Sequence, residues 1–295
     1  MESSNKPTSL YYCLSMTFHQ FAASFGIIVD RIYPCDRIQR VPTVSNPNKK
    51  NAAVYWDGRR GWGWVWGEVE KVQWWNDPDS KPWTDAEKRE WARKRREALE
   101  DKARRQREAA EKAEWIMSES RNGTHPYLAY KGFPDERAMV VGDDLIIPMR
   151  DLSGKHVLGL QYVTLEDNEW KKLFLPGQKS TGAVFAIGDE APETILCEGY
   201  ATGLSIALAV RKMGIRMRVV CCFSAHNIQA AAPMLEGRRF VFADNDRSGT
   251  GQRVAQETGL PWVTGDNVGE DANDLHRRAG IMAVMKKIHE ARKML

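Results

Sequence analysis

At 295 residues, the chain is long enough for two domains and a sizeable core. Hydrophobic residues make up 42% of it, which excludes a largely disordered protein. The net charge is only +4, and residues 118–295 carry equal numbers of basic and acidic side chains, so any nucleic-acid contact must be a local patch rather than a whole basic domain.

The cysteine pattern and the hydropathy indicate the cellular compartment. The cysteines, which include no C-x-x-C pair, are Cys13, Cys35, Cys197, Cys221 and Cys222. A disulfide framework is therefore not expected, and a reducing cytoplasm fits best. No apolar run approaches the ~20 residues that a membrane span needs, and the N-terminus shows no secretory pattern. We expect a cytoplasmic protein without a membrane segment.

The first 83 residues predict a small β-rich domain behind a leader at residues 1–15. Aromatic residues at helical spacing predict a helix that begins near Thr17 and ends near Gly26. Short apolar runs bounded by turn residues predict strands at 37–42, 53–58 and 61–67.

The last of these strands alternates tryptophan with small residues, which places Trp62, Trp64 and Trp66 on one face. Two interpretations of this face remain open. The tryptophans can form a compact core, as large aromatic residues usually do. Alternatively, they can stack on the bases of single-stranded DNA while Arg59 and Arg60 hold its phosphates.

Residues 84–117 predict a long charged helix. A capping box from Thr84 to Glu87 opens a run rich in Lys, Arg, Glu and Ala. Large apolar residues are sparse, so we expect a solvated helix of about 50 Å, at 1.5 Å per residue. Ion pairs between residues four apart would support it, and we interpret it as a helical linker.

Residues 118–188 predict a basic α+β subdomain. It begins with an H-P-Y-L-A-Y-K-G stretch at residues 125–132. A strand is expected at 145–151, followed by a turn and a hairpin partner at 157–163. The remaining segment, 171–187, is rich in lysine and ends in an apolar run.

After residue 189, short apolar runs alternate with helical stretches, a pattern that predicts a parallel sheet flanked by helices. The expected strands are 194–197, 219–223, 240–243 and 262–264. The expected helices between them are 202–213, 226–236 and 249–258. An amphipathic closing helix is predicted at 281–295.

Carboxylates follow the first and third strands of this sheet. Glu198 precedes a glycine, and Asp244 and Asp246 belong to a D-x-D-x-x-G segment. Ligands bind outside the carboxyl ends of the strands in such sheets, so these three side chains should meet at one edge. Crowded carboxylates repel one another and call for a cation, and oxygen ligands with room for water suit Mg²⁺.

These segments, taken together, resemble the Toprim domain of bacterial-type primases. The resemblance consists of a strand ending in E-G, a βα unit, a strand ending in D-x-D-x-x-G, and the G-E-D-A-N-D-L segment at 269–275. With the H-P-Y-L stretch, the closer similarity is to primases of phages and plasmids. It covers residues 118–280 well and residues 1–83 loosely, and it implies a Toprim domain at 189–280.

The resemblance implies roles for particular residues. Glu198, Asp244 and Asp246 would be catalytic and would bind Mg²⁺ or Mn²⁺, with further metal contacts from Asp271 and Asp274. Residues expected to contact nucleotide or nucleic acid are Arg150, Gln161, Lys172, Lys179, Gly199, Asn227, Arg247 and Gly249. Residues 1–83 occupy the place of the family's zinc ribbon, but Cys35 has no ligand partners, so no zinc is expected.

The implied activity is DNA primase: the synthesis of short RNA primers from NTPs on single-stranded DNA during phage or plasmid replication in a bacterial cytoplasm. No G-x-x-x-x-G-K-[ST] segment occurs, so a replicative helicase on a separate chain is implied as a partner. Two other classes remain open. One is a Toprim nuclease that uses the same carboxylates, and the other is a catalytically weak protein that binds single-stranded nucleic acid.

Overall fold

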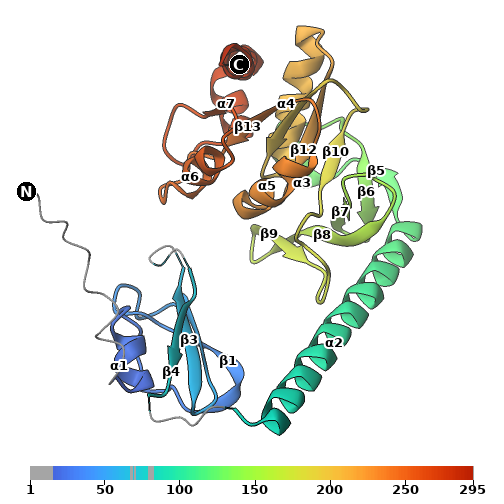
Figure 1. Ribbon diagram of the computed structural model, residues 1–295. Helices are drawn as coiled ribbons and strands as arrows, with labels where there is room; N and C mark the ends of the chain where they lie inside the picture. The colour runs from blue at the N-terminus through green and yellow to red at the C-terminus, as the bar shows by residue number, and fades with distance from the viewer. Residues whose placement is uncertain (1–15, 67–68, 70, 79–82, 295) are drawn as a thin grey trace, which may run out of the picture. The chain divides into compact units, whose positions relative to one another are not determined.

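The structure is a computed structural model that describes residues 16–66, 69, 71–78 and 83–294. The expected leader at residues 1–15, with Cys13, lies outside the described residues. The protein is a mixed α/β protein with several sheets, and the chain divides into two compact units, residues 1–92 and 93–295 (Figure 1).

The first unit is an antiparallel sheet with a short helix. Helix α1 spans Phe18–Ala23 and begins with a capping box in which Thr17 and Gln20 bond reciprocally. The strands, in their order across the sheet, are β1 (Cys35–Val41), β2 (Ala52–Trp56), β3 (Arg60–Val65) and β4 (Gln73–Asn76). Strand β4 adds to the three strands that the sequence predicts.

The core of the first unit lies on the glycine face of β3. A side chain on Gly61 would collide with the ring of Phe18, so the glycine allows the aromatic core to approach the strand closely. Val65 on the same face is fully buried. Trp62 and Trp64 lie on the opposite, half-exposed face. The strand turns its small residues inward, so these tryptophans are outside the core cluster of this unit, and their stacking on bases stays a prediction.

Helix α2 spans Asp85–Ser118, close to the predicted helical segment. Its early turns carry exposed ion pairs such as Arg93–Glu97, at 2.6 Å. Its last turns differ from the predicted solvated linker, because Ala109, Ala113 and Ile116 are buried in a hydrophobic cluster with residues of the following sheet. The end of the helix thus belongs to the core of the second unit.

After α2, the second unit continues with an antiparallel sheet. The strands, in their order across the sheet, are β5 (Arg121–Gly123), β6 (Ala138–Val141), β7 (Asp144–Arg150), β8 (Val157–Glu166) and β9 (Glu169–Phe174). Helix α3 (Pro126–Tyr130) lies within the H-P-Y-L stretch and is capped by His125. The predicted hairpin is the pair β7 and β8.

The second sheet of this unit carries the acidic segments. Its strands, in spatial order, are β10 (Phe185–Ile187), β12 (Met217–Cys221), β11 (Glu193–Cys197), β13 (Arg238–Ala243) and β14 (Trp262–Thr264). The four predicted strands are present and parallel. Strand β10 is antiparallel to β12, so the sheet is mixed rather than parallel throughout. Residues 188–192 alone separate β10 from β11, too few for a parallel crossover.

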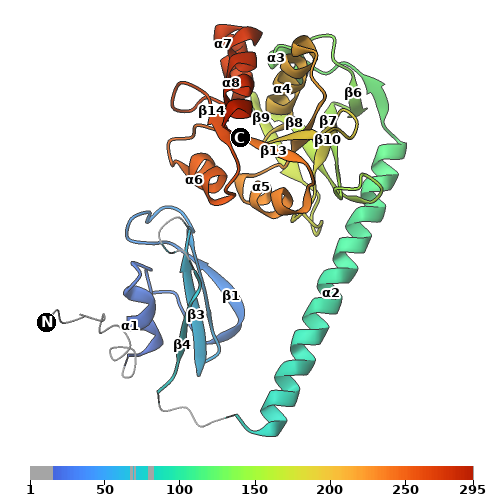
Figure 2. The ribbon, with the colours of Figure 1, turned by 45° about the horizontal axis from the view of Figure 1, so that its top comes forward.

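Helices cover both faces of this mixed sheet (Figure 2). The helices on one face, which share a hydrophobic cluster with the strands, are α4 (Tyr200–Met213), α7 (Ala272–Ala279) and α8 (Ile281–Lys293). The helices on the other face are α5 (Ala225–Ala231), which a 3₁₀ turn at Ala232–Met234 continues, and α6 (Thr250–Glu257). Within the described residues, no helix is long and apolar enough to cross a membrane.

Candidate metal and nucleotide site

Carboxylates from separate parts of the chain gather at one edge of the mixed sheet. Glu198 follows β11, and Asp244 and Asp246 follow β13, the parallel neighbour of β11. Asp271 begins α7, which comes after β14. These groups are close enough for their charges to affect one another, because the pKa of both Glu198 and Asp244 is raised partly by the neighbouring acids. The structure thus places Glu198, Asp244 and Asp246 near one another, together with Asp271, which the resemblance also implies as a metal contact.

Asp244 has the most unusual environment of the group. Burial raises the pKa of its carboxyl to about 8, and the charges of Glu198, Asp271 and Asp246 contribute to the rise, while Lys172 opposes it. Its Oδ1 atom is buried and has no hydrogen-bond partner among the described residues. An unpaired buried oxygen costs about 1–3 kcal/mol. Asp244 therefore favours a bound proton or cation.

Asp246 is held in a different way by the start of α6. It accepts hydrogen bonds from the Ser248 backbone N–H at 2.8 Å and the Ser248 hydroxyl at 2.5 Å. The Gly251 N–H donates to its second oxygen at 3.1 Å. Partial burial acts against ionisation, but these hydrogen bonds hold the pKa of Asp246 below its usual value. The two aspartates thus have opposite pKa shifts within one short segment.

Two glycines allow this geometry. Gly249, the N-cap residue of α6, has φ 67°, which glycine adopts without strain. Gly251 lies so close to the carbonyl oxygen of Asp244 that any side chain would collide with it. The helix therefore starts directly against the segment that carries Asp244 and Asp246, and the Gly251 amide donates to Asp246.

Glu198 directly follows β11 and is partly buried. Burial raises the pKa of its carboxyl, as do the charges of Asp246 and Asp271, while the Ala225 N–H and Lys172 lower it. Lys172 comes from β9, in the antiparallel sheet. Its Nζ lies 3.9 Å from the position that a Cβ on Gly199 would occupy, which places the ammonium group next to the residue that follows Glu198.

Asp271 and Asp274 form the capping box of α7. Asp271 accepts from the Asp274 N–H at 2.8 Å and, through its other oxygen, from the Thr202 hydroxyl of α4 at 2.9 Å. Asp274 lies 4.0 Å from the ammonium group of Lys131. Asp271 therefore belongs to the acidic edge, whereas Asp274 faces Lys131.

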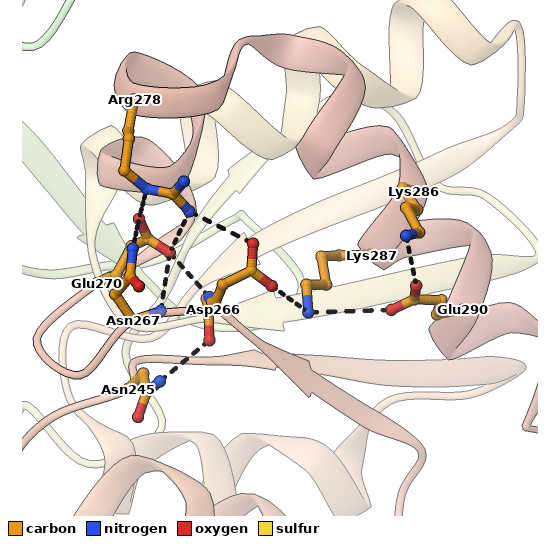
Figure 3. A network of polar contacts seen from close by, with 9 residues as sticks. Asn245, Asp266, Asn267, Glu270, Arg278, Lys286, Lys287 and Glu290 are labelled. Atoms are coloured by element: carbon orange, nitrogen blue, oxygen red, sulfur yellow. Dashed lines mark hydrogen bonds and ion pairs between the residues drawn. The ribbon is translucent and has the colours of Figure 1, made fainter.

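A polar network holds the loop that precedes Asp271 (Figure 3). Glu270 is only 5% exposed and receives two hydrogen bonds from Arg278, at 2.5 and 3.1 Å. The backbone N–H groups of Asp266 and Asn267 also donate to it, at 2.8 and 3.2 Å. The hydrogen bond from Arg278 is the main reason why the pKa of Glu270 falls to about 2, and the backbone bonds add to it.

Asn245 joins this network to the aspartates on either side of it. Its backbone N–H donates to the Glu270 carbonyl at 3.1 Å. Its side-chain Nδ2 donates to the Gly265 carbonyl at 3.0 Å (Figure 3). The Gln252 amide of α6 donates to its Oδ1 at 2.6 Å. The segment with Asp244 and the segment with Asp271 are therefore bonded to each other.

Sequence reasoning did not predict Thr202, Asn245, Glu270 or Arg278 as parts of the site. Glu270 and Asn245 do lie inside the two quoted acidic segments, which is the signal that could have singled them out. Thr202 is in the first turn after Gly199, where a hydroxyl faces the same sheet edge. Arg278 has no sequence signal, because its pairing depends on how the 265–271 loop folds.

Asn227 has a positioning role in the structure. Its Oδ1 accepts from the Gly182 N–H at 2.6 Å, and its Nδ2 donates to the carbonyls of Ala183 and Cys222, at 2.7 and 2.8 Å. These bonds fix the loop that carries Lys179 beside the end of β12. Lys179 itself is exposed on this loop.

The remaining residues expected to contact nucleotide differ in how far their side chains are buried. Gln161 is buried at 5% exposure on β8, opposite Phe174 of β9. Arg150, at the end of β7, donates to the Gly154 carbonyl at 3.3 Å. Arg247 is exposed directly after Asp246.

The outer face of the first unit carries a row of aromatic residues. Tyr55, Trp62 and Trp74 are cross-strand partners on β2, β3 and β4. The rings of Tyr55 and Trp62 are stacked with centroids 6.4 Å apart, and Trp74 is 71% exposed. Beside this row, Trp64 and Trp66 have ring centroids 4.5 Å apart.

The basic residues of the first unit lie mainly along β1, on one side of these aromatic residues. The guanidinium of Arg40 lies 3.9 Å from the ring centroid of Trp66. Arg40 also lines a hollow of about 890 Å³ along β1, together with Arg31, Arg37, Lys49, Lys50 and Asp30. Arg59 pairs with Glu87 at 2.9 Å, and Arg60 lies over Trp83 at 4.0 Å. The basic surface is therefore centred on β1 rather than on the arginines expected from the sequence.

Metal binding at the acidic edge would need water. Among the residues that the structure describes, no group of three or more His, Cys, Asp or Glu side chains is placed so that it could hold a metal ion. Mg²⁺ usually keeps several waters and takes one or two carboxylates from the protein. The unpaired Oδ1 of Asp244 and its acidic neighbours fit such a cation.

No protein-family model matches this sequence, and no curated protein matches it. The function is therefore inferred from the geometry of the acidic edge and from the sequence segments that form it.

Proposed function

We propose that this protein is a Toprim-type DNA primase that joins ribonucleotides into short RNA primers on single-stranded DNA. The observation that carries the proposal is the acidic edge, where Asp244 lies near Glu198, Asp246 and Asp271 and has a buried oxygen that no other described residue hydrogen-bonds. A carboxylate in this environment is stabilised by a bound cation, which compensates both the burial and the repulsion.

The residues fit Mg²⁺ or Mn²⁺. Asp244 and Asp246 would hold the metal, and Glu198 and Asp271 would contact it directly or through water. When bound, the metal would offset the charge of the triphosphate and lower the pKa of the attacking 3′-hydroxyl.

The protein's own side chains supply positioning and proton transfer. Asp246 is fixed by Ser248 and the first amides of α6, so its oxygens have a defined direction. Glu198, whose pKa is raised by burial, is suited to accept the hydroxyl proton as the 3′-oxygen bonds to the α-phosphorus and pyrophosphate leaves. Lys172 and Lys179 would screen the charge that develops on the phosphates.

The outer face of the first unit supports template binding. Aromatic rings stack on bases of any sequence, and basic residues along the same surface hold phosphates. Trp62, Trp64, Trp66 and Trp74 provide the rings, and Arg40 connects them to the basic hollow along β1. A replicative helicase on a separate chain and a cytoplasmic location are parts of the same proposal.

One assay tests the proposal against its two alternatives. The full chain is incubated with single-stranded DNA, labelled ribonucleotides and Mg²⁺. Short labelled oligomers are expected from the wild type and none from Asp244→Asn, which keeps the shape but loses the charge. Glu190→Gln, an exposed acid of the same unit, serves as the matched control and should keep activity.

The other outcomes identify the other classes. A shortened template without labelled product would assign the protein to the Toprim nucleases. Retained DNA with neither product would make it a single-strand-binding protein, and the primase proposal would then be withdrawn.

A further inference from the structure

Two phenylalanines form an open corner beside the acidic edge, and we refer to Phe174 and Phe223 together as the aromatic corner. Phe174 ends β9 and is 42% exposed, although it is a large apolar side chain. Its ring lies edge-on to that of Phe223, with centroids 6.3 Å apart and an angle of 81° between the planes. Phe223 follows β12 and is half-buried. The pair therefore presents aromatic surface to solvent.

The backbone at Phe223 is strained, and the strain ties its ring to the site. Phe223 has φ 65°, a conformation that is costly for a bulky residue. Its N–H donates to the carbonyl of Glu198 at 2.7 Å. This hydrogen bond holds the strained conformation where the chain leaves the sheet, next to Glu198. Strained residues are common at functional sites.

Lys172 connects the aromatic corner to the acidic edge. Lys172 and Phe174 are two residues apart on β9, so both side chains project from the same face of the strand, about 7 Å apart. The ammonium group of Lys172 reaches toward Gly199 and acts electrostatically on Glu198 and Asp244. One strand therefore presents a cation for phosphates and, beside it, an exposed ring.

We propose that the aromatic corner is the subsite for the base of the incoming ribonucleoside triphosphate. This inference rests on the proposed function and adds its base-binding residues. The triphosphate would lie between Lys172 and the carboxylates, and the base would stack on Phe174, with Phe223 supporting that ring from the edge. A phenyl ring offers no hydrogen bonds, so the subsite accepts all four bases, as copying a template requires.

Calorimetric titration of the full chain tests the subsite with two probes, ATP and inorganic tripolyphosphate, each in the presence of Mg²⁺. Tripolyphosphate has the charge of the nucleotide but no base. The wild type should bind ATP more tightly. Phe174→Ala should lose about tenfold in ATP affinity, the effect of one stacking contact, and keep its tripolyphosphate affinity.

Two further variants make the result unambiguous. Phe223→Gly removes the second ring at a φ that glycine prefers, so the variant should fold while its ATP affinity falls. Leu173→Ala is the control, because Leu173 is 46% exposed and lies on the opposite face of the same strand. It should leave both affinities unchanged.

The other outcomes overturn the inference in distinguishable ways. Equal ATP affinity in the wild type and Phe174→Ala, with primers still made, removes the subsite and leaves the primase proposal standing. An unchanged ATP affinity with weaker binding of single-stranded DNA assigns the corner to the template instead. If the wild type binds neither probe, the subsite and the proposed function fail together.

Discussion

At the scale of single residues, neighbouring carboxylates differ because their partners differ. Asp246 receives backbone and hydroxyl hydrogen bonds, which favour the ionised form. Asp244 has an oxygen without a hydrogen-bond partner in the described part of the chain, and burial disfavours its charge. One side chain is therefore a fixed anion, and the other gains most from a cation. This asymmetry is typical of sites whose function is to hold a ligand rather than to stabilise the fold.

Thr202 provides a residue-scale prediction. Thr202→Val keeps the shape but removes the hydrogen bond to Asp271, so the free energy of unfolding should fall by about 1 kcal/mol. Mg²⁺ affinity should fall several-fold as well, because Asp271 loses its orientation. Urea unfolding and Mg²⁺ titration measure the two effects. Unchanged Mg²⁺ affinity with the expected loss of stability would show that Asp271 does not serve the metal.

At the scale of elements, the loops after β13 and β14 act as one unit. Glu270 and Arg278 close the 265–271 loop, and Asn245 bonds that loop to the segment after β13 (Figure 3). The helix α7 then begins at Asp271, at the end of the same loop. The separation of Asp244 from Asp271 is therefore set by this network.

Glu270→Gln should lower the free energy of unfolding by about 1–3 kcal/mol at pH 7, because a buried charge-assisted pair is lost. The pKa of Glu270 is about 2 when folded and about 4.3 when unfolded, so its contribution is present above pH 4 and is lost as the pH falls toward 2. Urea unfolding at pH 7 and pH 3 should therefore show a smaller difference between wild type and variant at pH 3.

The matched control for this prediction is Glu290→Gln. Glu290 is 40% exposed and pairs only loosely with Lys286 and Lys287, at 4.0 Å, so its substitution should have little effect. An equal loss of stability in the two variants would contradict the special role of the Glu270 network.

Sequence patterns predicted local elements well and long-range arrangements less well. The runs ending at Cys197 and Ala243 were predicted as parallel strands because short apolar segments alternate with helices. The antiparallel direction of β10 was not predicted, since it follows from the short link at 188–192. Alternation in β3 showed that Trp62 and Trp64 share a face, but it did not show which face is covered. The pairing of Arg278 with Glu270 could not be predicted from the sequence, because it depends on how the 265–271 loop folds.

At the scale of the whole molecule, the two units differ in the charge and chemistry of their surfaces. The first carries exposed aromatic rings beside a basic hollow, and the second carries the acidic edge. An acidic site repels DNA unless cations are bound, so a separate surface for the template is a physical advantage. We infer that the first unit binds single-stranded DNA and the second performs the chemistry.

This division predicts separable defects. Trp62→Ala and Trp74→Ala should each weaken binding of single-stranded DNA about tenfold, by the loss of one stacking contact, and leave ATP affinity unchanged. Fluorescence anisotropy with a labelled oligonucleotide measures the first effect and calorimetry the second. Trp115→Ala, which removes a 63% exposed tryptophan from α2, is the control. Wild-type DNA affinity in both variants would exclude the aromatic row from template binding.

The central claim is that the acidic edge binds a divalent cation, and calorimetric titration of Mn²⁺ or Mg²⁺ into the full chain without nucleotide tests it most directly. The account predicts that the wild type binds the metal and that Asp244→Asn and Asp246→Asn each lose at least tenfold in affinity, while Glu190→Gln does not. Equal binding by all four proteins, or no binding by the wild type, would contradict it.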